Sequence, residues 1–136
     1  ERQYIYKICK NYNPIYRKYF WYINYKINKR KLDDCANIIL GEHDFKYFCK
    51  TISKKENNSC VIDKSKWIFN KDLIFYEITA NRFLHHMVRM LVGTMIEVAK
   101  DSMPLEMFYK MIQGKDIKSR VITCPAHGLY LNKVNY

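Results

Sequence analysis

The chain has 136 residues, a formal net charge of +11 and hydrophobic residues at 49% of its positions. This length suits one domain with a buried core, and the apolar content excludes an intrinsically disordered segment. No apolar run reaches the roughly 18 residues that a membrane-spanning helix needs. The positive charge favours an anionic partner, and RNA or DNA fits it better than a lipid surface does.

Five cysteines are spread along the chain without a CxxC pair: Cys9, Cys35, Cys49, Cys60 and Cys124. An odd number in this arrangement is a poor disulfide framework and indicates reduced thiols inside a cell. His85 and His86 are adjacent, so on a helix they point about 100° apart and do not form the i, i+4 pair of a zinc site. We therefore expect an intracellular protein without a metal.

The first forty residues predict a strand followed by a helix. Side chains alternate over residues 2–9, which predicts a strand. Residues 11–14 predict a turn, and the aromatic-rich residues 16–24 an extended segment over the core. Helical spacing of apolar residues over 29–40 predicts a helix, with Gly41 as its stop.

A short anchored turn and a loop come next. In GEHDFKYF, residues 41–48, we expect Asp44 to cap a turn that Phe45 and Phe48 anchor in the core. Residues 51–60 are polar and predict a solvated, mobile loop.

Two strands and a long helix form the centre of the chain. Residues 61–69 and 73–80 predict strands joined by a hairpin turn at 70–72. The apolar residues of TANRFLHHMVRMLVGTMIEVAK, residues 79–100, have the spacing of one helix face, and the helix is expected to start near residues 81–84.

Arg89 lies at the margin of the apolar face of this helix, beside His85 and Gly93. A permanent charge at the edge of a buried face needs a partner or an opening. A purely structural arginine, which reaches water or bonds a nearby carboxylate, also fits this position. Spacing alone therefore leaves both a structural and a functional arginine open.

The chain closes with a short helix and a strand. Pro104 opens the helix and Gly114 ends it. Residues 116–127 form a connection, and the apolar phase shifts within the strand at 128–136, which predicts a β-bulge. The order strand, helix, two strands, helix, helix, strand favours an α+β domain, a mainly antiparallel sheet with helices packed on one face. No linker divides residues 1–136.

Four segments carry a resemblance to a known family: RQYIY at 2–6, LGEHDFKYF at 40–48, ITANRFLHHMVRMLVGTMIEV at 78–98 and TCPAHGLYLNKVNY at 123–136. In this order they resemble four motifs of the tRNA pseudouridine synthase A (TruA) family. These are its [K/R]xYxY strand, its GxHDFxxF element, its long helix motif and its closing xAPAxGLYLxxVxY strand. The long helix motif is the most specific of the four.

The resemblance implies a pseudouridine synthase fold and an isomerase reaction. Such enzymes convert uridine to pseudouridine within the anticodon stem-loop of tRNA, and they need no cofactor. The implied partners are tRNA and, for the full-length protein, a second copy in a homodimer, with no membrane. The implied location is the cytoplasm, or an organelle if the source is a eukaryote.

The resemblance also implies roles for single residues. Tyr4 matches the active-site tyrosine that stacks on the target base and serves in proton transfer, for which a phenol on a strand is suited. Arg89 matches the arginine that pairs with the catalytic aspartate. Phe83 and Leu84 match apolar residues that line the pocket near the uracil, although core packing explains Leu84 equally well.

One family motif is missing from this sequence. The catalytic aspartate of the family lies in an RTDxGVHA-like motif upstream of the tyrosine strand, and residues 1–136 contain no such motif. We therefore expect this chain to be the C-terminal half of an enzyme, inactive without the other half. The main alternative is a non-catalytic basic RNA-binding module, which would not need Arg89. A structural dimerisation domain is a weaker alternative.

Overall fold

The computed structural model describes residues 1–50, 57–115 and 121–134. Within these residues six strands form one sheet: β1 (Arg2–Cys9), β2 (Trp21–Tyr22), β3 (Gly41–Asp44), β4 (Ser59–Asn70), β5 (Leu73–Ala80) and β6 (Leu129–Val134). The helices of this part of the chain are α1 (Lys29–Ile39), α2 (Met87–Ala99) and α3 (Leu105–Ile112). Short 3-10 turns occur at Tyr16–Lys18, Lys46–Phe48 and Ala126–Gly128.

The sheet is mainly antiparallel, with the strand order β2-β1-β5-β4-β3 and β6 also paired with β1. β1 pairs with β5 along its whole length, from Arg2 opposite Ala80 to Cys9 opposite Leu73. On its other side, the first part of β1 pairs with β6 and its last two residues pair in parallel with β2. The α+β class and the mainly antiparallel sheet are thus confirmed.

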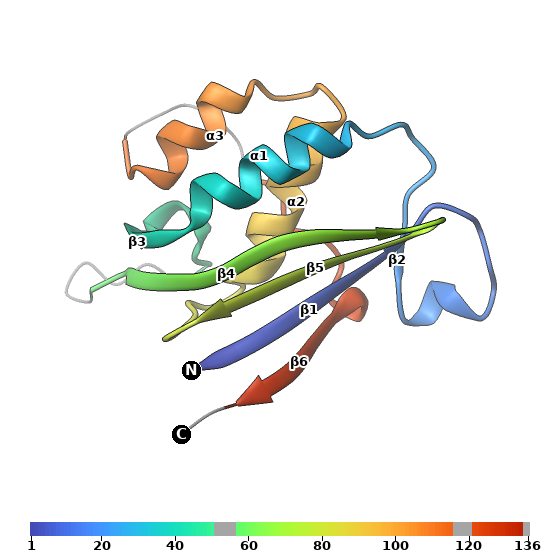
Figure 1. Ribbon diagram of the computed structural model, residues 1–136, viewed down its shortest axis with the longest axis horizontal. Coiled ribbons are helices and arrows are strands. Elements are labelled where there is room, and N and C mark those ends of the chain that lie inside the picture. The colour runs from blue at the N-terminus through green and yellow to red at the C-terminus, as the bar shows by residue number, and fades with distance from the viewer. Residues whose placement is uncertain (51–56, 116–120, 135–136) are drawn as a thin grey trace.

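All three helices lie on one face of the sheet (Figure 1), as the sequence predicts. α2 places ten buried residues against the sheet and the other helices, and Leu91, Val92 and Met95 among them are fully buried. The predicted apolar face of β5 is also buried: it consists of Ile74, Tyr76, Ile78 and Ala80.

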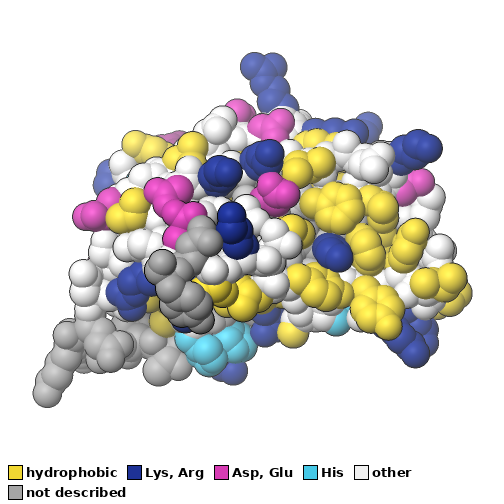
Figure 2. Space-filling view, turned by 60° about the horizontal axis from the view of Figure 1, so that its bottom comes forward, with side chains coloured by type: hydrophobic (Ala, Val, Ile, Leu, Met, Phe, Trp, Pro, Cys, Tyr) yellow, Lys and Arg dark blue, Asp and Glu magenta, His cyan; other side chains and the backbone are white. Residues whose placement is uncertain are grey.

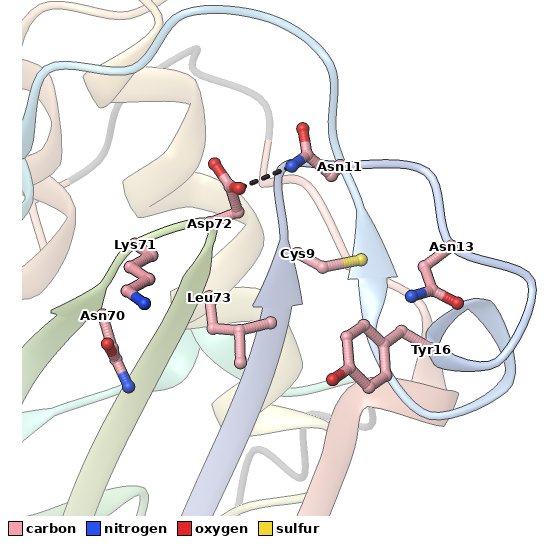
Figure 3. A pocket seen from close by; sticks show the side chains of 8 residues that line it. All are labelled: Cys9, Asn11, Asn13, Tyr16, Asn70, Lys71, Asp72 and Leu73. Atoms are coloured by element: carbon pink, nitrogen blue, oxygen red, sulfur yellow. Dashed lines mark hydrogen bonds between the residues drawn. The ribbon is translucent and has the colours of Figure 1, made fainter.

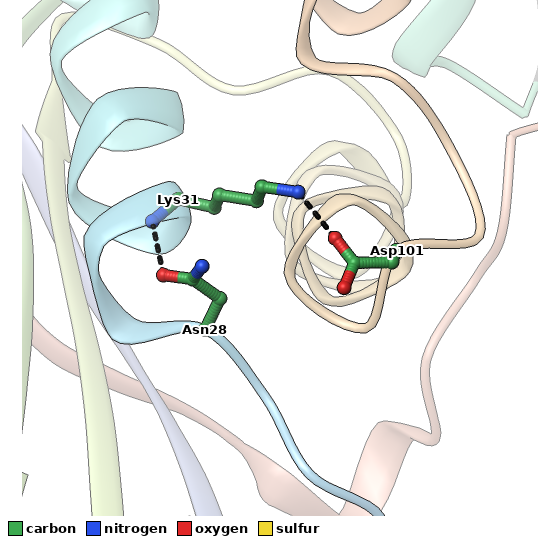
Figure 4. A network of polar contacts seen from close by, with 3 residues as sticks. All are labelled: Asn28, Lys31 and Asp101. Atoms are coloured by element: carbon green, nitrogen blue, oxygen red, sulfur yellow. Dashed lines mark hydrogen bonds and ion pairs between the residues drawn. The ribbon is translucent and has the colours of Figure 1, made fainter.

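The start of α1 is tied to the end of α2. The Asn28 side chain caps α1 by accepting a hydrogen bond from the Lys31 backbone nitrogen at 3.2 Å (Figure 4). The Lys31 ammonium pairs with Asp101, just beyond α2, and the Asn28 backbone nitrogen donates to the Ala99 carbonyl at 2.8 Å. α1 then ends at Ile39, one residue before its predicted end.

The predicted start of α2 is wrong, because the helix begins at Met87. The side chain of Asn81 accepts a hydrogen bond from the Val61 nitrogen, and its backbone nitrogen donates to the Val61 carbonyl. These bonds extend the pairing of β4 and β5 past Ala80. The chain then turns through residues 81–86, and His86 has a left-handed φ of 64°, which is incompatible with a continuous helix.

The GEHDFKYF segment behaves as predicted, with one addition. Asp44 accepts a hydrogen bond from the Lys46 nitrogen at 3.0 Å, and Phe45 and Phe48 are fully buried. Residues 41–44 also form the edge strand β3, which was not expected from the sequence. Of the loop predicted at 51–60, residues 51–56 lie outside the described residues, and Ser59 already belongs to β4.

The remaining predictions are confirmed in part. The bulge in β6 is present at Asn132, because Gln3 pairs with Lys133 and Tyr4 pairs with Leu131. Residues 16–24 form a 3-10 turn and the short β2 instead of one extended segment. Residues 116–120 of the predicted connection and residues 135–136 of the predicted strand lie outside the described part of the chain.

Candidate active site

Tyr4 and Phe83 meet at the beginning of β1. Tyr4 lies on the helix-covered face of the sheet with Tyr6 and Ile8, but it is half-buried whereas those two are fully buried. Phe83 comes from the turn between β5 and α2. The two rings pack edge to face, with their centroids 5.0 Å apart. This contact joins two segments that are almost eighty residues apart in the sequence.

Leu84 has mainly a packing role. Its side chain is only 9% exposed and belongs to the hydrophobic core. Its carbonyl accepts a hydrogen bond from the Met87 nitrogen at 3.1 Å, which shapes the turn that leads into α2. The structure therefore favours the core-packing interpretation for most of this side chain.

Arg89 is half-buried in the first turn of α2 and is held by two neighbours. Its Nε donates to the Cys124 carbonyl at 2.8 Å, and its Nη1 lies 3.3 Å from Nδ1 of His86. No carboxylate pairs with Arg89 among the described residues, and no acceptor for Nη2 is present there. The guanidinium is therefore oriented by a carbonyl and an imidazole, and it keeps donors for a further partner.

The segment 121–125 crosses α2 beside Arg89. The Cys124 nitrogen donates to the Arg89 carbonyl at 3.2 Å, and the Ile122 nitrogen donates to Oγ1 of Thr94 at 3.3 Å. Gly93 permits this crossing, because a Cβ at that position would lie 2.3 Å from the Ile122 carbonyl oxygen. The close approach explains the glycine in the middle of a buried helix.

Tyr6 connects this segment to β1. Its hydroxyl donates to the Pro125 carbonyl at 2.6 Å. Burial raises the pKa of this hydroxyl well above its ordinary value, and the nearby Cys124 raises the pKa further, so Tyr6 remains a neutral donor. Burial also raises the pKa of the Cys124 thiol to about 12. Neither group supplies a charge at neutral pH.

His86 is the remaining titratable neighbour of the Arg89 guanidinium. Desolvation lowers the pKa of the His86 imidazole, and the nearby His85, Arg89 and Lys50 lower it further. The neutral imidazole is thus favoured at neutral pH, and Arg89 supplies the fixed positive charge in this part of the site.

Besides Leu84, the predicted site residues lie in two contact groups. Tyr4 touches Phe83, whereas Arg89 contacts His86 and Cys124, and no direct contact between Tyr4 and Arg89 is found among the described residues. Tyr6 follows Tyr4 by two residues on the same face of β1, and its hydroxyl bonds the Pro125 carbonyl, next to Cys124 in the chain.

Tyr6, His86 and Cys124 had no expected role from the sequence. His86 precedes Arg89 by three residues, a spacing that brings side chains together on a helix. That spacing could have pointed to the pair, whereas nothing in the sequence marks the carbonyls that Arg89 and Tyr6 bond.

Two other features lie away from this site. A cavity of about 330 Å³ opens at the far end of β1 (Figure 3), lined by Cys9, Asn11, Asn13, Tyr16, Asn70, Lys71, Asp72 and Leu73. On the face of the sheet without helices, hydrophobic side chains gather with lysines and arginines around them (Figure 2). Lys7 lies there, with its Nζ 4.4 Å from the centre of the Tyr130 ring.

No helix in residues 1–50, 57–115 and 121–134 is long and apolar enough to cross a membrane. In the same ranges no three His, Cys, Asp or Glu side chains are grouped so that they could hold a metal ion.

Comparison with known proteins gives one consistent result. A family model described as tRNA pseudouridine synthase matches residues 35–136. The chain is 39% identical to the tRNA pseudouridine synthase A of Dictyoglomus thermophilum, over 99% of this chain and 56% of that protein. It is 32% identical to the protein of the same name from Brachyspira hyodysenteriae, over 97% of this chain and 54% of that protein.

The fold and the matches define a domain of the pseudouridine synthase class. The chain belongs to the tRNA pseudouridine synthase family. The resemblance that the four sequence motifs carry is thereby confirmed. The chain spans about half the length of the curated relatives that it matches.

Proposed function

We propose that this chain is the C-terminal catalytic and RNA-binding domain of a tRNA pseudouridine synthase, which isomerises uridine to pseudouridine in the anticodon stem-loop. The convergence of three family motifs carries this proposal. Tyr4 of the first strand motif contacts Phe83 of the helix motif. Arg89 of the helix motif bonds Cys124 of the closing motif. A convergence at one end of α2 is what a shared substrate site requires.

In this proposal each residue has a distinct task. Tyr4 offers a half-buried ring for stacking on the target base and a hydroxyl for proton transfer. Phe83 packs edge to face with the Tyr4 ring, and Leu84 supplies apolar surface next to Phe83 in the chain. Arg89 directs its remaining guanidinium hydrogens to the catalytic aspartate, holding that carboxylate ionised and oriented.

The catalytic aspartate comes from a segment outside residues 1–136. The sequence lacks the RTDxGVHA-like motif, and no carboxylate among the described residues pairs with Arg89. The proposed enzyme needs no cofactor, because the base is detached, turned and rejoined to the same sugar. Its partners are tRNA and a second copy of the full-length protein. It acts inside the cell, where its tRNA substrate is, and the net charge of +11 suits that polyanion.

Tritium release from tRNA labelled at uridine C5 tests the proposal in the full-length protein. We expect the wild type to turn over and Arg89→Leu to lose at least about 100-fold in kcat/KM, because the aspartate loses an oriented charge partner. Arg89→Lys should lower kcat/KM nearly as much, since a lysine lacks the planar guanidinium that bonds a carboxylate with two hydrogen bonds.

Arg30→Leu is the matched control, because Arg30 is exposed on α1 and its loss changes the net charge equally. It should retain near-normal turnover. If Arg89→Leu kept normal turnover, or if the full-length protein bound tRNA without making pseudouridine, the non-catalytic RNA-binding module would be the better description.

A further inference from the structure

We propose that His86 is a positioning residue for Arg89: its neutral imidazole accepts a hydrogen bond at Nδ1 from the Arg89 guanidinium and fixes the orientation of that group. The contact between Nη1 of Arg89 and Nδ1 of His86 is inferred from their geometry. Its consequence for catalysis rests on the proposed function of Arg89.

The backbone holds His86 firmly at the start of α2. The residue has φ 64° and ψ 11°, in the left-handed region, directly before the first helical residue. Its carbonyl accepts a hydrogen bond from the Met90 nitrogen at 3.0 Å. The side chain makes no capping bond to the helix, and its Nδ1 instead lies 3.3 Å from Nη1 of Arg89. A left-handed non-glycine residue costs conformational energy, and such strain concentrates at functional sites.

Chemistry fixes the direction of this hydrogen bond. A guanidinium is only a donor, so the ring nitrogen that faces it must be an unprotonated acceptor. The proton of the neutral ring is therefore on Nε2. A protonated ring would lose the acceptor and place a second positive charge beside Arg89.

The surroundings of His86 favour its neutral form. The titratable groups that face it among the described residues are His85, with ring centroids 4.1 Å apart, Arg89 and Lys50. Lys50 comes from the segment after β3, and its backbone nitrogen donates to the His85 carbonyl at 3.1 Å. All three disfavour an added proton, and together with desolvation they lower the pKa of His86.

The pair of contacts leaves one edge of the guanidinium for a substrate-side partner. Nε is used by the Cys124 carbonyl and one Nη1 hydrogen by His86. Among the described residues, the other Nη1 hydrogen and both Nη2 hydrogens have no acceptor. A carboxylate that approaches them meets a group whose plane is already fixed, so less orientational freedom is lost on pairing.

Nitrogen-15 NMR of this chain tests the contact without any catalytic assay. We expect the Nε2–H tautomer of His86 at pH 7.5 and a titration midpoint below the ordinary value of about 6.5. Arg89→Gln should raise the midpoint, because it removes the neighbouring cation, whereas Arg30→Gln should leave it unchanged. A protonated Nδ1 at pH 7.5, or a midpoint that does not respond to Arg89→Gln, would overturn the proposal.

Two substitutions in the full-length protein test the consequence. In His86→Gly the glycine can adopt the left-handed backbone conformation, but the hydrogen-bond acceptor for Arg89 is removed. In His86→Asn the asparagine also tolerates that conformation, and its amide oxygen can lie near the position of Nδ1. We expect His86→Gly to lose about 10-fold in kcat with little change in KM for tRNA. His86→Asn should recover part of the loss, without the decline in rate that protonation of His86 causes at acidic pH.

His85→Asn is the control, since His85 is exposed and makes no bond to Arg89 among the described residues. A His86→Gly enzyme with wild-type kcat and an unchanged pH profile would overturn the catalytic part. If the wild-type full-length protein made no pseudouridine, the proposed function would fail, and the NMR result alone would decide whether His86 orients Arg89.

Discussion

Gly93→Ala is expected to destabilise the domain, although the same change in an ordinary helix stabilises it. The added Cβ would lie 2.3 Å from the Ile122 carbonyl oxygen, 2.9 Å from its carbonyl carbon and 3.0 Å from the Cys124 nitrogen. Ordinary contacts begin near 3.4 Å, so the backbone at 122–124 must retreat by about 1 Å. No flexible side chain can absorb this displacement.

The magnitude follows from three opposing effects. Overpacking costs about 1–3 kcal/mol. The retreat also weakens two hydrogen bonds, from Ile122 to Thr94 and from Cys124 to Arg89, at about 0.5–1.5 kcal/mol each. Against these costs, the higher helix propensity of alanine stabilises the helix by about 1 kcal/mol. The net loss in the free energy of unfolding is therefore about 1–5 kcal/mol.

Urea unfolding followed by circular dichroism measures this loss. Gly114→Ala is an informative comparison, because Gly114 has φ 73° but its nearest neighbour atom is 3.7 Å from the added Cβ. The free energy of unfolding of that variant should fall by about 1 kcal/mol through backbone strain alone. The Cys124 thiol should also react faster with a thiol reagent in Gly93→Ala, because its segment is displaced. A Gly93→Ala chain as stable as the wild type would refute the account of the crossing.

Three further predictions concern the cap, the thiols and RNA binding. Asn28→Ala should lower the free energy of unfolding by about 1 kcal/mol in the same urea assay, because the cap of α1 is lost. Burial raises the pKa of Cys35 and of Cys124 to about 12, so both thiols should react with Ellman's reagent at pH 8 only after unfolding; fast reaction in the native state would contradict their burial. The affinity for tRNA should fall with salt, and each lost phosphate contact should reduce the logarithmic slope by about 0.7–0.9; a salt-independent affinity would argue against an electrostatic RNA surface.

The sequence predicts strands well where one face is buried. The bounds of β1 and β5 match the expected ranges, because alternation along a strand directly reflects its two faces. The shift of apolar phase also revealed the bulge in β6. The start of α2 was missed for a tertiary reason: Asn81 is held by Val61, and Leu84 is buried from a turn, where its spacing imitates a helix.

The candidate site is only partly accessible to sequence reasoning. Helical spacing places Arg89 at the margin of a buried face, and the resemblance supplies Tyr4 and Phe83 as its companions. The acceptor of Arg89 is a backbone carbonyl 35 positions away, and a carbonyl has no sequence signature. The edge strand β3 was missed for a related reason, since its residues are largely exposed and lack a clear alternation.

Arg89 combines a structural and a proposed chemical task in one side chain, and the structure separates them by atom. Nε bonds the Cys124 carbonyl beside α2, whereas Nη2 and the remaining Nη1 hydrogen meet no acceptor in the described part of the chain and can donate to a carboxylate. Losing the Cys124 bond in Arg89→Leu costs about 1–3 kcal/mol, because a half-buried carbonyl is left without this donor. A domain of this size has about 5–15 kcal/mol of stability, so the variant stays folded. A large loss of turnover in folded Arg89→Leu therefore reports on the local contacts of the guanidinium and not on unfolding of the domain.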